Sequence, residues 1–168
     1  PGRPADVRIK DGRIVEIGEL EPMGDVVVQA NGLTLAPGFI DTHSHHAGGF
    51  QEDRTASDAT SQGITTIISG QDGGSDIPLA KFFHDLEAMP PAINVAAYSG
   101  HNSIREQVMG EDYKRQAGAD EIGKMRRLLA ADMDAGALGL STGLEYDPGI
   151  YSSREEVLTL AREAAAHG

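Results

Sequence analysis

Short alternating runs of apolar and polar residues open the chain. The runs at residues 7–10 and 13–17 flank the pair Asp11-Gly12 and are rich in β-branched residues. Because an Asp-Gly pair suits the positive backbone angles of a type I′ turn, this pattern predicts a β-hairpin. Three consecutive valines predict a further short strand at residues 26–28. Since these strands are half-polar, we expect them to form a small sheet of their own.

From about Leu33 the pattern changes to strands that alternate with helices. The predicted strands are residues 34–43, 64–68, 93–98 and 137–141. The predicted helices are residues 55–62, 78–89 and 120–135, with a fourth that opens at Ser152 and Ser153. Such alternation is typical of α/β proteins in which right-handed crossovers join parallel strands. The four βα units predict the first half of a TIM-like (β/α)8 barrel, with a doubly wound open sheet as the competing architecture.

Residues at the predicted helix ends support these boundaries. Gly63 and Gly136 stand where two of the helices end, and glycine is favoured just past a helix C-terminus. Ser152 and Ser153 each precede a glutamate by three residues, which is the capping-box signature of a helix N-terminus. Apolar residues at helical spacing predict ordinary core packing for the third helix: Ile122, Met125, Leu128, Leu129 and Met133.

Composition narrows the classes of function. The chain has 168 residues, of which 39% are hydrophobic, so it can bury a domain-sized core. Its 26 acidic and 14 basic residues give a net charge of −12, which disfavours binding to nucleic acids and to anionic membranes. The absence of cysteine excludes disulfides and thiolate metal ligands within this segment, but it leaves the cellular compartment open.

The chain ends and the apolar runs bear on context. No run approaches the roughly 18 apolar residues of a membrane span. The opening residues 1–4 are typical of a linker inside a longer chain, so we expect this sequence to be a fragment. We expect the parent protein to be cytoplasmic, with the periplasm as an alternative, because a signal peptide would precede these residues.

Two histidines mark the end of the first predicted barrel strand. His43 and His45 are two positions apart, so both imidazoles are expected on the same face of the strand. Two neutral imidazoles on one face can bind one divalent metal ion. The alternative is that the pair is merely polar at a strand end, but barrel enzymes place their chemistry at this end of the strands. His46 is expected on the other face, in a structural or surface role.

Several motifs together resemble one enzyme family. Residues 35–45, Leu-Ala-Pro-Gly-Phe-Ile-Asp-Thr-His-Ser-His, resemble the first-strand signature of the amidohydrolase superfamily. The motifs that resemble its N-acyl-D-amino-acid deacylase (D-aminoacylase) branch are residues 63–66, residues 70–73, Gly100-His101 with Arg105, and residues 139–149 with Tyr151. The resemblance implies part of a small β-sandwich domain over residues 1–32 and the first four βα units of the barrel over residues 33–168.

The resemblance also implies a chemistry. Family members carry one or two divalent metal ions, usually zinc, and His43 and His45 would bind one of them. A metal-activated water would then hydrolyse a linear amide, here the acyl bond of an N-acyl-D-amino acid. The aspartate that handles the proton belongs to the eighth strand, which is expected beyond residue 168. We therefore assign no catalytic residue within this chain and expect the fragment alone to be inactive.

Two carboxylates are candidates for completing the metal site. The resemblance favours Glu145, just after the fourth strand, as a bridging ligand, whereas an exposed loop glutamate is the plainer interpretation. Asp72 stands where some family members have a cysteine ligand, so either its carboxylate takes over or the ligand set moves to Glu145. Asp72 is also a common turn residue before Gly73. The loop at residues 70–75 lacks the Lys-Ser/Thr ending of a phosphate-binding loop.

Three residues are candidates for substrate contacts. Tyr151 resembles the family tyrosine that contacts the free carboxylate of the substrate. His101 could line the pocket, and Arg105 could pair with a carboxylate in a bidentate manner. For each of the three a buried structural role is the alternative.

Two other functions remain open. The first-strand signature is shared with cyclic-amide hydrolases of the dihydroorotase or hydantoinase type. A non-catalytic amidohydrolase homologue with a structural role is the other alternative, although it would have no need of metal ligands. We expect a small-molecule N-acyl amino acid as the partner, no nucleic acid and no membrane. The oligomeric state, the acyl group and the side chain accepted are left open.

Overall fold

The computed structural model describes residues 2–168, and the chain divides into two compact units. The first, the N-terminal unit, ends at Ala36, and the second, the C-terminal unit, spans Pro37–Gly168. Each unit is described by itself below.

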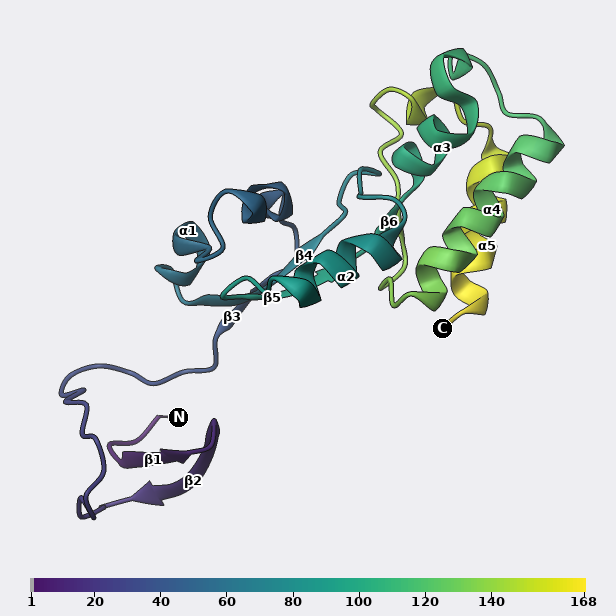
Figure 1. The fold of residues 1–168 in the computed structure, drawn as a ribbon. Helices are drawn as coiled ribbons and strands as arrows, with labels where there is room; N and C mark the ends of the chain where they lie inside the picture. The colour runs from purple at the N-terminus through teal and green to yellow at the C-terminus, as the bar shows by residue number, and fades with distance from the viewer. Residues whose placement is uncertain (1) are drawn as a thin grey trace. The chain divides into compact units, whose positions relative to one another are not determined.

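The N-terminal unit contains the expected β-hairpin (Figure 1). Strand β1 (Asp6–Lys10) pairs antiparallel with β2 (Arg13–Gly18). Asp11 and Gly12 have φ angles of 51° and 71°, so the positive angles expected of a type I′ turn are confirmed. The guanidinium of Arg8 donates to the Asp25 carboxylate at 2.9 Å, which ties the segment after the hairpin to β1.

The prediction of a strand at residues 26–28 is wrong. This stretch has no strand pairing, and Val26 and Val28 are 95% and 83% exposed. A β-branched sequence favours a strand only where a neighbouring strand offers backbone partners and a surface to pack on. Neither is present for these valines among residues 2–168.

The C-terminal unit is built on parallel strands, as the alternating pattern predicts. Strands β3 (Phe39–Asp41), β4 (Ile64–Ser69) and β5 (Asn94–Ala97) form a parallel sheet in chain order. Strands β6 (Ser99–Gly100) and β7 (Leu140–Ser141) form a second parallel pair. The first strand is much shorter than the predicted residues 34–43, because its ladder begins only where the Phe39 amide meets the carbonyl of Gly63.

The helices of this unit follow the predicted order with one addition. They are α1 (Ser57–Thr60), α2 (Leu79–Ala88), α3 (His101–Met109), α4 (Ala119–Asp134) and α5 (Arg154–Ala166), with short 3-10 helices at His46–Gln51, Gly110–Asp112 and Gly149–Tyr151. Helix α3 was not predicted, since the sequence pattern placed His101 at a strand end. Ser153 caps α5 by accepting from the Glu156 amide at 3.1 Å, as the capping box predicts. No helix within residues 2–168 is long and apolar enough to cross a membrane.

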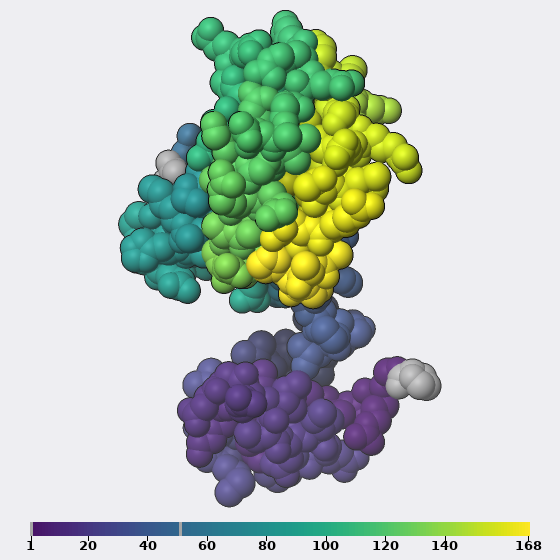
Figure 2. All heavy atoms as spheres, turned by 90° about the vertical axis from the view of Figure 1, so that its right-hand side faces the viewer, coloured from purple at the N-terminus to yellow at the C-terminus, as the bar shows by residue number. Residues whose placement is uncertain are grey.

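Two apolar clusters hold the C-terminal unit together. One surrounds Ile67 of β4, and the other joins α3, α4 and α5 through Ile104, Met125 and Leu160, which are all fully buried. Helices α4 and α5 lie side by side in both views (Figures 1 and 2). The buried Met125 of α4 confirms the predicted apolar stripe. This packing makes a support against which the loops at the strand ends are held.

Candidate metal centre

His43 and His45 follow directly on β3. Between them, Ser44 is buried, and its amide donates to the Ile68 carbonyl at 3.0 Å, which continues the contact with β4 beyond the strand end. The His43 amide donates to the Asp41 carboxylate at 3.1 Å. Because Ser44 points inward, its two neighbours both point away from the core, and their rings lie 5.4 Å apart between centroids. The spacing of two residues thus places both imidazoles together, as predicted.

The loop after β4 carries Asp72 to the same place. Gln71 donates from its side-chain amide to the Thr42 carbonyl at 2.7 Å, so the loop is joined to the end of β3. Asp72 itself has a φ of 56°, a left-handed conformation that aspartate tolerates better than most residues. Gly70 and Gly73 on either side also have positive φ angles, 78° and 81°. The sharp turn presents the Asp72 carboxylate to the histidine pair.

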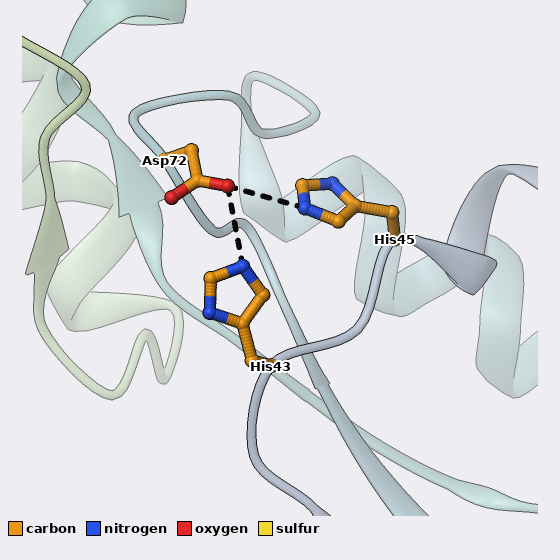
Figure 3. Close-up of side chains that lie close together, drawn as sticks. All are labelled: His43, His45 and Asp72. Atoms are coloured by element: carbon orange, nitrogen blue, oxygen red, sulfur yellow. Dashed lines mark hydrogen bonds and ion pairs between the residues drawn. The ribbon is translucent and has the colours of Figure 1, made fainter. Parts of the chain in front are cut away.

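One carboxylate oxygen of Asp72 faces both imidazoles (Figure 3). Its Oδ2 lies 3.2 Å from His43 Nε2 and 3.3 Å from His45 Nε2. All three side chains are open to solvent, with exposed fractions of 58%, 66% and 43% for His43, His45 and Asp72. Among residues 2–168, this is the one group of three or more His, Cys, Asp or Glu side chains that converge closely enough to hold a metal ion.

The donor set fits a divalent metal such as zinc. Zinc binds histidine nitrogen and carboxylate oxygen at about 2.0–2.2 Å, so the ligand atoms of a tetrahedral site lie about 3.3 Å apart. The distances from Asp72 Oδ2 to the two nitrogens match that separation. A histidine-carboxylate hydrogen bond accounts for one such contact, but a single carboxylate oxygen against two imidazoles is the arrangement of ligands around an ion. Three protein ligands leave a coordination position for water or substrate.

Glu145 is not part of this group. It is exposed in the loop after β7, and the structure brings Asp72, and not Glu145, to the two histidines. Of the two possibilities that the sequence left open, the geometry favours ligation by the aspartate at the position where some family members carry cysteine. His46, expected to lie apart from the pair, contacts Asp58 of α1 through Nδ1 at 2.5 Å.

His101 and Arg105 lie in a different environment. Both begin α3 and both are fully buried. His101 Nε2 lies 2.8 Å from the Glu156 carboxylate, and the Arg105 guanidinium donates to both oxygens of the same carboxylate. Burial alone would raise the pKa of Glu156, but the hydrogen bonds from His101 and Arg105 outweigh it and lower the pKa. The predicted substrate contacts of these two residues therefore compete with a satisfied buried ion pair.

Tyr151 is half-buried in the 3-10 helix before α5. Its ring packs against that of Tyr113 at 5.9 Å between centroids, and its carbonyl accepts from Arg105 at 3.5 Å. These contacts are those of a structural tyrosine. Its predicted contact with a substrate carboxylate stays a prediction.

Asn102 is a residue of the site region that the sequence analysis did not single out. It is 7% exposed, and its side-chain amide donates to the Gly143 carbonyl at 3.0 Å. A Cβ on Gly73 would lie 2.4 Å from the Asn102 Oδ1, and one on Gly149 would lie 2.5 Å from it. The backbone of the Asp72 loop and that of the loop after β7 therefore meet at this amide. The glycines of both motifs were the signal that could have indicated such a close approach.

A pocket of about 340 Å³ opens beside the three candidate ligands. His45 and Asp72 line one side of it, and residues of α3 and of the loop after β7 line the rest. The other lining residues are Gln71, Gly74, Asn102, Ser103, Glu106, Tyr146, Asp147 and Pro148.

These features define the class of the protein. Parallel strands alternate with helices, and a group of candidate ligands with an adjoining pocket lies at the carboxyl ends of β3 and β4, where α/β proteins of this kind bind their ligands. Residues 26–168 match the model of the amidohydrolase family, and the chain belongs to that family. The family resemblance of the sequence motifs is thus confirmed.

Named relatives are similar over the whole chain. D-aminoacylase of Alcaligenes xylosoxydans xylosoxydans is 35% identical over 100% of this chain, and N-acyl-D-glutamate deacylase of the same organism is 40% identical over 100%. The crystal structure of N-acyl-D-glutamate deacylase from Bordetella bronchiseptica, complexed with zinc and a phosphonate inhibitor, superposes with a TM-score of 0.89 at 37% identity over 99% of this chain. The chain spans 40%, 39% and 40% of the length of these three proteins.

Proposed function

We propose that the complete protein carrying this chain is a metal-dependent amidohydrolase that removes the acyl group from N-acyl-D-amino acids. The observation that carries the proposal is the convergence of His43, His45 and Asp72 on one point at the strand ends. The relatives that match at 35% and 40% identity are deacylases of this kind, which supports a linear-amide substrate over a cyclic one. The family membership of the chain supports hydrolysis of a carbon-nitrogen bond.

The three side chains would hold one divalent metal ion, and zinc suits this set of two nitrogens and one oxygen. A zinc ion bound there would polarise the amide carbonyl and lower the pKa of a water molecule towards neutrality. The chain's own residues prepare the site. Gln71 fixes the Asp72 loop on the end of β3, and the inward Ser44 fixes the direction of both imidazoles. A second metal ion and a bridging role for Glu145 belong to the same proposal and depend on residues outside this chain.

The proposal includes an architecture for the complete protein. The N-terminal hairpin would be part of a small β-sandwich domain, and the parallel strands of the C-terminal unit would be the first part of a (β/α)8 barrel. The similarity to the N-acyl-D-glutamate deacylase structure supports this assignment. The residue that moves the proton would come from a later strand, as it does by resemblance in the family.

The first test combines metal analysis with activity. The complete protein is purified without added metal, its zinc content is measured by elemental analysis, and release of free amino acid from N-acetyl-D- and N-acetyl-L-amino acids is followed on the same samples. Hydantoin and dihydroorotate serve as cyclic substrates. We expect one or two zinc ions per chain and selective release from the D-substrates.

Other outcomes contradict the proposal in distinct ways. Stoichiometric zinc with cleavage of the cyclic substrates alone would assign the protein to the cyclic-amide hydrolases. Absence of bound metal after reconstitution would refute the enzyme hypothesis and support a non-catalytic homologue. Selective release from the L-substrates would retain the amidohydrolase and refute the D-specificity.

A further inference from the structure

The pocket beside the candidate ligands is acidic even after the metal site is set aside. Asp72 and His45 line it, but these would serve the metal ion, whose positive charge compensates the carboxylate. Two further carboxylates line the same pocket, Glu106 of α3 and Asp147 of the loop after β7. Both are exposed to solvent and are in their charged form at neutral pH. The pocket next to the reacting centre therefore has two negative charges that no metal ion would offset.

The position of one of these carboxylates is held by a neighbour. The hydroxyl of Tyr113 donates to Asp147 Oδ2 at 3.1 Å, and this hydrogen bond raises the pKa of Tyr113. Asp147 follows Tyr146, which lines the pocket as well. A hydrogen-bonded carboxylate at a pocket wall acts as a fixed charge for whatever part of a ligand enters it.

No basic side chain offsets these charges within the described part of the pocket. None of the residues that line it is Lys or Arg. Arg105, the cation that α3 carries one position before Glu106, is fully buried and donates to both oxygens of Glu156. Its second terminal nitrogen donates to the carbonyls of Tyr113 and Arg115. The arginine on this helix is therefore engaged in the core and is not available to receive an anionic group.

The remaining lining groups are polar and uncharged. Gln71, Asn102, Ser103 and Tyr146 supply amide or hydroxyl groups. Such a wall suits a polar side chain better than the plain alkyl group of an acetyl substituent. The α-carboxylate, which every N-acyl amino acid carries, is repelled from this pocket by Glu106 and Asp147. The amino-acid side chain is then the part of the substrate that fits here.

We propose that this pocket receives the side chain of the D-amino acid and selects neutral polar or cationic side chains against acidic ones, with Glu106 and Asp147 as the specificity-determining residues. The proposal rests on the proposed deacylase function and narrows its substrate class. It distinguishes this protein from the relative named as an N-acyl-D-glutamate deacylase, in spite of 40% sequence identity.

The test compares three substrates that share the acetyl group. The complete zinc-loaded protein is assayed with N-acetyl-D-lysine, N-acetyl-D-glutamine and N-acetyl-D-glutamate, and kcat/KM is measured for each. Glutamine and glutamate differ in charge at nearly constant shape. We expect kcat/KM to be at least about tenfold higher for the glutamine and lysine substrates than for glutamate, since a unit charge several Å away in a partly solvated site changes binding by roughly three- to tenfold.

Charge-neutralising variants identify the residues. Glu106→Gln and Asp147→Asn together should reduce the preference for lysine over glutamate by about tenfold, again from the interaction of unit charges. Glu111→Gln, which removes an exposed charge of the neighbouring 3-10 helix outside the pocket lining, is the matched control and should leave the preference unchanged. Zinc content and thermal unfolding of every variant are measured alongside, so that a folding defect is recognised as such.

Each outcome bears on one of the two proposals. Faster cleavage of the glutamate substrate would overturn the specificity proposal and leave the deacylase function in place. A preference that survives in the double variant would overturn the role of Glu106 and Asp147. If none of the three substrates, nor any other N-acyl-D-amino acid, is hydrolysed, the proposed function fails and the specificity proposal fails with it.

Discussion

Two groups of histidine and carboxylate lie in the C-terminal unit, and they differ in almost everything except their chemistry. In the first, His43 and His45 face one oxygen of Asp72 at 3.2 and 3.3 Å in an open site. In the second, Nε2 of His101 lies 2.8 Å from Glu156 with both side chains fully buried. The contrast shows that a histidine near a strand end carries little information until its partners are known.

The difference lies in what else reaches the carboxylate. Glu156 accepts from the guanidinium of Arg105, so its charge is compensated within the core. Asp72 meets two imidazoles, which are neutral when they act as metal ligands, and its charge is left for an ion. A buried carboxylate without its cation is costly, whereas an exposed group of ligands costs the fold little. The buried group is thus suited to stability and the exposed group to function, which four variants or conditions can test.

The largest expected effect is on activity in the exposed group. In the double variant His43→Ala/His45→Ala, the complete protein should lose most of its bound zinc and more than about a hundredfold of its kcat/KM, since even residues that only support metal ligands cost about 10–100-fold. Thermal unfolding of the metal-free forms should hardly change, because both side chains are exposed. Elemental analysis and substrate release provide the measurements.

His46→Ala is the matched control, because His46 pairs with Asp58 and lies outside the group. It should retain zinc. Equal loss of zinc in the control and in the double variant would contradict the assignment of the ligands.

The next effect is on stability in the buried group. Glu156→Gln leaves the Arg105 guanidinium buried without its anion, so the free energy of unfolding should fall by about 3–5 kcal/mol, the range for breaking a buried ion pair from one side. Denaturant titration of the complete protein measures it. Glu155→Gln, at the neighbouring exposed position of α5, should change it by less than about 0.5 kcal/mol. A small effect of Glu156→Gln would place this pair outside the stabilising core.

A smaller effect distinguishes ligation by Asp72 from a mere turn role. Asp72→Asn keeps the turn-forming amide but removes the anionic ligand, so zinc affinity should fall by about 10–100-fold. Asp72→Cys restores an anionic ligand, since a cysteine that binds zinc does so as the thiolate, and should recover much of the affinity. Competition with a chromogenic chelator measures both. Unchanged affinity in Asp72→Asn would shift the ligand role to Glu145.

The smallest expected effect is the pH dependence of stability. The pKa of Glu156 lies below its ordinary value of 4.5 in the folded protein. A carboxyl group with a lowered folded pKa stabilises the fold above its unfolded pKa, and this contribution is lost as the pH falls through the folded pKa. The free energy of unfolding should therefore decrease on acidification below about pH 4.5. Glu156→Gln should lack this part of the slope, and an identical slope in the variant would contradict the linkage.

Local signals in the sequence predicted the elements whose cause is local. The Asp11-Gly12 turn, the strand at β4 and the Ser153 cap of α5 depend on neighbouring residues, and all three are found. The valines at residues 26–28 had strand propensity without a partner strand, and α3 was missed because its buried positions include charged residues such as Arg105. Propensity was overridden in both places by what the rest of the chain offers.

The sequence by itself determined that two imidazoles point the same way at a strand end, because side chains in a strand repeat every two residues. Only the tertiary structure decided which carboxylate meets them. Asp72 reaches His43 from 29 positions away, and Glu156 reaches His101 from 55 positions away. Local backbone preferences act over a few residues, whereas such encounters depend on strand pairing and on the packing of α3 against α5, which place distant segments in contact.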